Sequence, residues 1–313
     1  MIIAVTGLNT ASEPAAGYGV LKSLNDCGDH DLIGLVYEPL ETCIYQNGLM
    51  KKAYLLPYPE KDSGEYLNRL SQIKSNAGMD ILIPNQNREI PLLINSVSAL
   101  DGMGIKTLLP HRQSLRDIFK GELTERLKER AVSFSLPSME GSADRIFIPS
   151  LGKSPVQNAN IFRNIEGEEF STALLADRDH QVAGSVSIKK LLTSPGGSTW
   201  MGLTIDDDEL SDLAEEIVAQ TGWTGPMTIN MLRNENGNLC IRNVQPVFPD
   251  WINFAATAGV NLPSLLVDIL QGKKVSSVSR IIPGKLFVRM SIDIVADIDR
   301  FGTFSLTGEL SND

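Results

Sequence analysis

The first third of this chain alternates between short apolar runs and segments with helical spacing, and this alternation constrains the fold most strongly. Apolar runs bounded by turn residues predict strands, and the spaced segments predict helices between them. The predicted strands cover residues 2–7, 31–38, 52–57, 80–84 and 105–110, and the predicted helices cover residues 14–25, 66–76 and 89–104. This order favours a doubly wound, mostly parallel sheet. We therefore predict an α/β domain over residues 1–111, which binds ligands at the carboxyl ends of its strands.

The turn after the first predicted strand is rich in glycine, with Gly7, Gly17 and Gly19 in GLNTASEPAAGYG. Their spacing differs from the G-x-G-x-x-G fingerprint of dinucleotide-binding folds. We expect these glycines to serve a turn and the close packing of a helix. A small anion at the amino end of that helix is the alternative.

The second half has the pattern of an antiparallel α+β domain. Two hairpins are predicted at residues 168–192 and 225–246, and the second contains an Asn-Gly turn. Between them, residues 207–223 have the spacing of an amphipathic helix. We interpret the acidic run Asp206–Glu209 as the capped, dipole-compatible start of this helix rather than as a metal site.

The remaining segments complete a two-domain prediction. Helices are expected at residues 251–259 and 263–272, followed by a last β segment at residues 284–295 and a polar tail. The change from parallel to antiparallel patterning falls within residues 112–145, which we predict to be a helical linker region. The second domain is then predicted to cover residues 146–313.

Charge and cysteine content restrict the partners. The formal net charge of −10 repels phosphate backbones, which argues against nucleic acid as a partner. The amino-terminal apolar run is too short to cross a membrane, and it lacks the basic start of a signal peptide. Three scattered cysteines predict neither a disulfide framework nor a zinc site, and a reducing, cytoplasmic location fits them. These are Cys27, Cys43 and Cys240.

Several motifs in order resemble the ATP-grasp superfamily, in particular its carbamoyl-phosphate-synthase-like branch, over roughly residues 1–275. DILIPNQNREIPLL resembles a strand with an acidic turn, and IEGEEF resembles the family's G-x-E-[YF] element. NGNLCIRNVQPVFPDW resembles its hallmark strand, in which glutamate, asparagine, proline and arginine are usual. The resemblance implies a pre-ATP-grasp-like α/β domain followed by an ATP-grasp-like α+β domain with an antiparallel sheet.

Enzymes of this superfamily use ATP and Mg²⁺ to form an acyl phosphate, which an amine then captures. The resemblance places the metal positions at Asn230, Asn243 and Gln245, where this chain carries neutral amides. Hard divalent ions prefer carboxylates beside phosphate oxygens. Val247 stands where the family has an arginine that would bind the transferring phosphate. We predict degenerate metal positions and no catalytic residue, although a hydrogen-bonded network of the three amides is the structural alternative.

The resemblance also implies a small lid with a glycine-rich loop that covers the phosphates. In this chain only Leu151 to Asn160 are available for it, which is too short for a lid. Most of the lid is therefore predicted to be missing, and exclusion of water with it.

A vestigial nucleotide site is predicted from residue types that survive or differ at matching positions. Lys120 and Lys153 match phosphate contacts, and Glu169 matches a ribose contact. Phe162 and Arg163 stand at the adenine hinge, where the family commonly has glutamine and glutamate. The alternatives are solvated surface lysines and a charge at a strand edge.

Two functions fit these residues. The first is a degenerate ATP-grasp-fold protein, a pseudo-ligase that acts as a scaffold, regulatory partner or small-molecule binder without a cofactor. Its partner would be a second copy of the chain or an active relative. The alternative is an active, divergent carboxylate-amine ligase that uses ATP and Mg²⁺.

Overall fold

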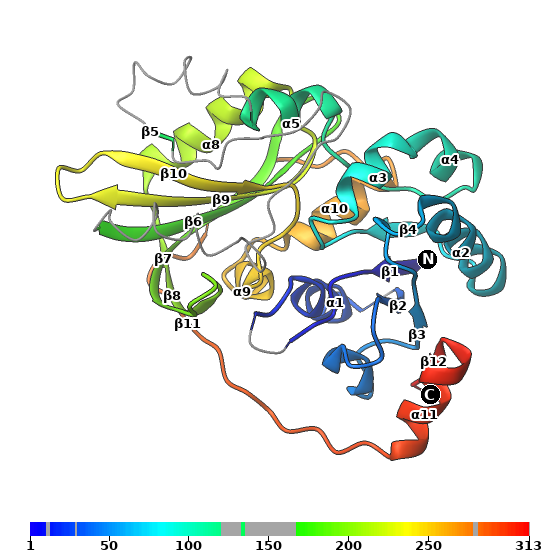
Figure 1. The fold of residues 1–313 in the computed structure, drawn as a ribbon. Helices are drawn as coiled ribbons and strands as arrows, with labels where there is room; N and C mark the ends of the chain where they lie inside the picture. The colour runs from blue at the N-terminus through cyan, green and yellow to red at the C-terminus, as the bar shows by residue number, and fades with distance from the viewer. Residues whose placement is uncertain (11–12, 29, 120–132, 135–166, 278–280, 313) are drawn as a thin grey trace.

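The computed structural model describes residues 1–10, 13–28, 30–119, 133–134, 167–277 and 281–312. Within them, the strands form a five-stranded mixed sheet and a seven-stranded sheet (Figure 1). The first sheet has the order β12 (Glu309–Ser311), β3 (Lys52–Leu55), β2 (Asp31–Val36), β1 (Ile2–Val5) and β4 (Ile81–Ile83). The second has the order β11 (Leu286–Val288), β8 (Thr199–Ile205), β7 (Val182–Thr193), β6 (Gly167–Ala176), β9 (Gly225–Asn234), β10 (Leu239–Gln245) and β5 (Ser133–Phe134).

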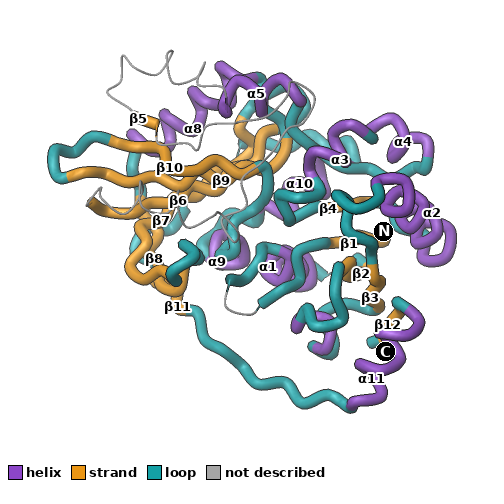
Figure 2. The backbone as a smooth tube through the Cα atoms, in the orientation of Figure 1, coloured by secondary structure: helices purple, strands orange, loops and turns teal. Residues whose placement is uncertain are grey.

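Helices lie on both faces of each sheet, and Figure 2 shows this layering in the described residues. The helices are α1 (Gly17–Asn25), the 3₁₀ turn η1 (Thr42–Tyr45), α2 (Ser63–Ala77), α3 (Ile90–Asn95), α4 (Val97–Gly102), α5 (Arg112–Phe119), α8 (Asp208–Thr221), α9 (Ile252–Thr257), α10 (Leu262–Leu270) and α11 (Ile298–Thr307). Helices α1, α9 and α10 lie between the two sheets, and α5 and α8 cover the outer face of the larger one.

The alternation of side chains along β1 explains the layers. Ile3 and Val5 face the central apolar cluster with α1 and α10, whereas Ala4 faces the cluster with α2. Successive side chains of a strand point to opposite faces, so a strand buried on both faces reads as a continuous apolar run. The parallel pairing of β1 with β2 and β4 confirms the mostly parallel sheet predicted for the first third.

The predicted hairpins and the capped helix of the second half are confirmed. Strands β6 and β7 pair antiparallel around the turn that begins at Asp177, and β9 pairs antiparallel with β10. Asp207 accepts a hydrogen bond from the backbone N–H of Leu210 and so caps α8, as the acidic run predicted.

Four elements differ from the sequence predictions. Residues 105–110 contribute a single bridge between Ile81 and Lys106 rather than a fifth strand, and the helix predicted at residues 89–104 is interrupted at Ser96. The strand β8 was not predicted. The tail expected after residue 295 instead forms α11 and β12, which pairs antiparallel with β3. Local periodicity carries no information about such a pairing between distant segments. The domain division at residue 146 stays a prediction.

Candidate functional site

A cavity of about 340 Å³ lies between the two sheets, where the carboxyl ends of β1 and β4 face the polar side of β6, β9 and β10. The loop after β4 and the first βα loop supply one wall. The other wall consists of strand residues and of the β7–β8 loop. Polar side chains from both walls line the cavity, namely those of Asn9, Glu13, Asn85, Gln86, Asn87, Arg88, Ser171, Lys190, Ser198, Thr228, Asn230, Gln245 and Asp250. The cavity lies at the edge where open α/β sheets bind their ligands, and ligand binding there stays a prediction.

A larger cavity of about 950 Å³ lies beside the extended segment that follows β11. Met290 and Ile292, which line it, are about four-fifths exposed. We regard the smaller cavity as the functional candidate because polar groups from the sides of both sheets converge there, whereas the larger cavity owes its volume to an isolated extended segment.

A buried carboxylate fixes the loop after β4. Glu89 is fully buried, and its carboxylate accepts hydrogen bonds from the hydroxyls of Thr6, Tyr37 and Tyr66 and from the backbone N–H of Gln86. Burial raises the pKa of Glu89, and these donors oppose the rise. The wall formed by residues 85–88 is therefore held rigidly to β1.

A second buried carboxylate holds the first βα loop. Glu41 accepts hydrogen bonds from the backbone N–H groups of Leu8, at 3.0 Å, and Tyr37, at 2.8 Å. Burial raises the pKa of Glu41 to about 7, and the two backbone donors lower it in part. The loop that carries Glu13 toward the cavity thus begins at a fixed point.

The glycines of the first βα turn have the structural roles that we expected. Gly7 has a φ of +73°, which favours glycine, and Gly17 brings α1 against the end of β1. A Cβ added at Gly17 would lie 2.8 Å from the carbonyl carbon of Gly7. A Cβ at Gly19 would lie 2.9 Å from a methyl group of Ile252 in α9. These positions explain the close packing of α1 between the sheets.

The structure brings together the three amides predicted at the metal positions. Asn243 lies opposite Asn230 in the β9–β10 ladder, and Gln245 lies opposite Thr228. Asn230 and Gln245 line the cavity. The amide nitrogen of Asn243 is buried and makes no hydrogen bond, and no hydrogen bond joins the three side chains to one another in the described residues. They share a face without forming the amide network that was the alternative.

Glu169 and Val247 also fall within this region. Glu169 forms an ion pair with Arg242 at 2.6 Å, and its strand β6 lies between β7 and β9. The alternative reading of Glu169 as a strand-edge charge is therefore wrong, while its ribose role stays a prediction. The side chain of Val247 is 4% exposed and packs in the cluster under α8. Lys120, Lys153, Phe162, Arg163 and the segment from Leu151 to Asn160 lie outside the described residues.

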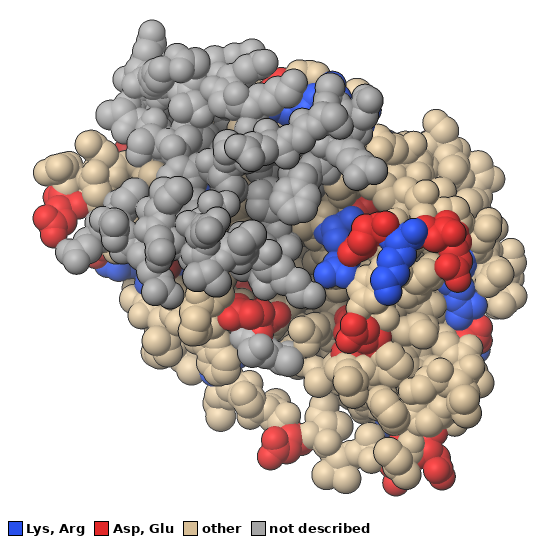
Figure 3. Space-filling view, in the orientation of Figure 1, with Lys and Arg blue, Asp and Glu red and all other residues tan. Residues whose placement is uncertain are grey.

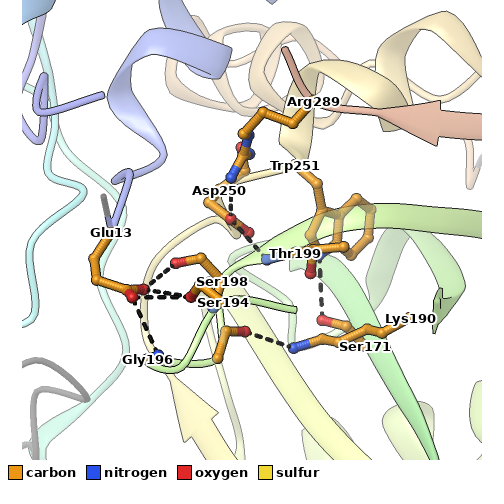
Figure 4. A network of polar contacts seen from close by, with 11 residues as sticks. Glu13, Ser171, Lys190, Ser194, Gly196, Ser198, Thr199, Asp250, Trp251 and Arg289 are labelled. Atoms are coloured by element: carbon orange, nitrogen blue, oxygen red, sulfur yellow. Dashed lines mark hydrogen bonds and ion pairs between the residues drawn. The ribbon is translucent and has the colours of Figure 1, made fainter. Parts of the chain in front are cut away.

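Sequence reasoning missed a charged group at the opposite side of the cavity (Figure 4). Asp250 accepts hydrogen bonds from the guanidinium of Arg289, at 2.7 Å, and from the backbone N–H of Thr199, at 3.1 Å. Lys190 donates a hydrogen bond to the carbonyl of Gly197 at 3.2 Å. Burial lowers the pKa of Lys190, whereas the negative charges of Asp250 and Glu169 raise it. The only sequence signal was the polar end of VFPDW.

Glu13 reaches across the cavity to the β7–β8 loop. Its carboxylate accepts hydrogen bonds from the hydroxyls of Ser194 and Ser198 and from the backbone N–H of Gly196 (Figure 4). The indole N–H of Trp251 donates to the hydroxyl of Ser171 nearby, at 3.3 Å. Contacts between segments about 180 residues apart leave no local pattern, so the sequence gave no indication of this one.

The donor set of the amide positions does not fit Mg²⁺. Amide oxygens bring no negative charge, and Mg²⁺ in nucleotide sites usually takes one or two carboxylates. Glu169, on the same face, is already paired with Arg242. In the part of the chain that the structure describes, no three side chains of His, Cys, Asp or Glu gather closely enough to hold a metal ion. The amide positions therefore give no support for a reaction step that uses Mg²⁺.

The fold is similar to those of several solved enzymes. Pyruvate carboxylase from Rhizobium etli matches with a TM-score of 0.58 and 13% identity over 91% of this chain and 28% of that chain. The L-amino acid ligase from Bacillus licheniformis matches with a TM-score of 0.56 and 12% identity, over 86% of this chain and 74% of that chain. The biotin carboxylase domain of 2-oxoglutarate carboxylase from Hydrogenobacter thermophilus, solved as a dimer with MgADP, ADP and bicarbonate, matches with a TM-score of 0.55 and 13% identity, over 91% and 73%.

These three proteins are ATP-grasp proteins, and the chain therefore has the ATP-grasp fold, as its motifs implied. At such low identity the likeness establishes the fold alone, and the carbamoyl-phosphate-synthase-like branch stays a prediction. Neither a protein-family model nor a curated protein matches the sequence. This chain spans 28% of the length of the pyruvate carboxylase.

Surface charges and helix lengths relate to the predictions about nucleic acid and membranes. On the face in Figure 3, basic and acidic side chains of the described residues are intermixed over the smaller sheet and its helices. No helix in the described ranges combines the length and the apolar character that a membrane span requires. The predictions about nucleic acid and cytoplasmic location stay predictions.

Proposed function

We propose that this ATP-grasp-fold protein no longer performs metal-dependent phosphoryl transfer and instead binds a small molecule in the cavity between its two sheets. One observation carries the proposal. Asn230, Asn243 and Gln245 come together on the cleft face, and all three are neutral where a nucleotide-bound metal would need carboxylates. The fold is kept while the charge required for the reaction is not.

Two further contacts support this reading. Val247, at the position of the phosphate-binding arginine, is buried among apolar side chains and offers nothing to a phosphate. Glu169 is paired with Arg242 at 2.6 Å, so its negative charge is already partnered within the chain.

Isothermal titration of the full chain with ATP tests the proposal, with Mg²⁺ in one series and a chelator in the other. We expect no micromolar binding that depends on Mg²⁺. Micromolar, magnesium-dependent affinity would overturn the proposal and favour the alternative, an active carboxylate-amine ligase. Such an enzyme would resemble the Hydrogenobacter thermophilus domain, which binds MgADP.

A partner chain belongs to the same proposal. The Hydrogenobacter thermophilus domain is a dimer, and a pseudo-ligase of this fold would associate with a second copy or with an active relative. Light scattering during size-exclusion chromatography would measure the mass directly. A dimeric mass supports self-association, and a mass near 34.2 kDa leaves an active relative as the proposed partner.

A further inference from the structure

The β7–β8 loop, Ser194 to Ser198, surrounds a carboxylate. The hydroxyl of Ser194 lies 2.9 Å from both oxygens of Glu13, the hydroxyl of Ser198 lies 2.7 Å from Oε2, and the N–H of Gly196 lies 3.1 Å from Oε1. Three neutral donors from one short loop thus converge on a single anionic group (Figure 4). Backbone and hydroxyl donors arranged in this way form anion-binding concavities in many proteins.

The loop is shaped independently of Glu13. Ser194 and Ser198 close it with a backbone hydrogen bond of 2.9 Å, and the N–H of Ser198 also donates to the hydroxyl of Ser194 at 3.1 Å. Gly197 has a φ of +93°, a conformation that favours glycine. Since these bonds lie within the loop, its donors would stay in place if Glu13 withdrew.

Gly196 shows that the concavity has the size of an oxyanion. A Cβ added there would lie 2.5 Å from Oε2 of Glu13, closer than real Cβ contacts. The glycine leaves the space that the carboxylate fills, although its own φ is not in the left-handed region. Lys190 lines the same cavity and hydrogen-bonds the carbonyl of Gly197, so a cation stands beside the concavity.

The carboxylate of Glu13 is held by neutral donors alone. Glu13 takes part in no ion pair of the described residues, whereas Asp250, which lines the same cavity, pairs with Arg289. Part of what the hydrogen bonds from these neutral groups to the carboxylate contribute is offset by the entropy cost of ordering the Glu13 side chain. A free anion with similar acceptors could therefore compete for these donors.

We propose that Ser194, Gly196 and Ser198 form a binding site for a small oxyanion, a carboxylate or a phosphate, and that Glu13 occupies this site as a displaceable internal group. Glu13 belongs to the first βα loop and the site belongs to the larger sheet. Binding of the oxyanion consequently releases a contact between the two halves of the molecule. The inference names the chemical class of the ligand, and it rests on the proposed function only for the cavity in which that ligand binds.

The test titrates the full-length variant Glu13→Ala with acetate and with inorganic phosphate at constant ionic strength, followed by calorimetry. We expect at least one anion to bind about tenfold or more tightly than it binds the wild type. A gain for acetate alone identifies the ligand group as a carboxylate, and a gain for phosphate alone identifies it as a phosphate. If neither anion gains affinity, the proposal is overturned.

Matched variants separate the site from general effects. Ser194→Ala in the Glu13→Ala background should return the affinity to the wild-type level, whereas Ser75→Ala, an exposed serine of α2, should leave the gain intact. Asp31→Ala removes a surface carboxylate that is paired with Lys51 and does not line the cavity, and it should produce no gain. If Glu13→Ala does not fold, the same titration is carried out with Glu13→Gln, which removes the charge at nearly constant volume. Magnesium-dependent ATP binding would overturn the proposed function without producing the acetate response, so the two failures are distinguishable.

Discussion

The loops of the smaller sheet and the β9–β10 ladder of the larger sheet differ in their use of acidic side chains. In the loops of the smaller sheet, Glu41 and Glu89 are buried, and each accepts hydrogen bonds that fix a loop. In the ladder of the larger sheet, Asn230 and Asn243 face each other as amides, and one amide nitrogen has no partner. The structural carboxylates are retained, while those expected to hold a metal are absent from the matching positions.

This difference separates carboxylates that stabilise the fold from the positions that the family resemblance assigns to a metal. A buried carboxylate surrounded by hydroxyl and backbone donors stabilises the architecture, because each donor would otherwise be unsatisfied. Amides on a half-buried strand face can bind a polar ligand but bring no charge.

The largest predicted effect concerns Glu89. Glu89→Ala removes the acceptor of four hydrogen bonds in a fully buried position, so the free energy of unfolding should fall by about 3–5 kcal/mol. Urea unfolding measures this change. Glu60→Ala, at an exposed ion pair, is the control and should stay within about 0.5 kcal/mol of the wild type. A similarly small change at Glu89 would show that this wall does not depend on its carboxylate.

The second prediction concerns pH. Burial raises the pKa of Glu41 from 4.5 to about 7, so the folded protein keeps a proton that the unfolded chain has lost. The contribution of Glu41 to stability is thus complete below about pH 4.5 and is lost as the pH rises toward 7, by a few kcal/mol at most. Glu41→Gln should flatten this part of the dependence. Equal slopes for variant and wild type, in urea unfolding at about pH 5 and about pH 8, would contradict it.

A smaller effect is expected where α1 meets β1. Gly17→Ala places a Cβ 2.8 Å from the carbonyl carbon of Gly7, and the resulting shift should cost about 1–3 kcal/mol of folding free energy. Gly102→Ala in α4 is a matched control, since nothing lies within 4 Å of its added Cβ. Thermal unfolding of both variants compares them. Equal midpoints would mean that the close approach of α1 is not required.

The smallest effect tests the other wall directly. Asn230→Asp together with Asn243→Asp replaces two facing amides by carboxylates of the same shape, and should raise the affinity for Mn²⁺ about tenfold, or about 1.4 kcal/mol. Asn76→Asp, at an exposed position of α2, should leave the affinity unchanged. If the double variant binds Mn²⁺ no better than this control, lost charge is not what separates the two walls.

Local patterns predicted much of the fold. The apolar run of β1 and the capped start of α8 follow from contacts within a few residues, and both are confirmed. The pairing of β12 with β3 joins segments about 250 residues apart, so no periodicity near Glu309 could indicate it.

The candidate site was predicted in part. The motif resemblance assigned Asn230 and Asn243 to the metal positions, and the ladder register places them opposite each other. The roles of Glu13 and Lys190 escaped prediction, because both act through loops that are brought together only by the complete fold. A single acidic residue in a glycine-rich turn has no sequence signature that distinguishes a surface charge from an occupant of an anion site.

The central claim is that the amide wall does not hold a divalent cation together with a nucleotide. Electron paramagnetic resonance of Mn²⁺ measures this directly, because bound ions lose the spectrum of the free ion. With the wild-type chain and ADP present, we predict that the protein removes no Mn²⁺ signal beyond what ADP removes alone. A protein-dependent loss of signal at micromolar concentrations would contradict the account and place a working metal site in this cleft.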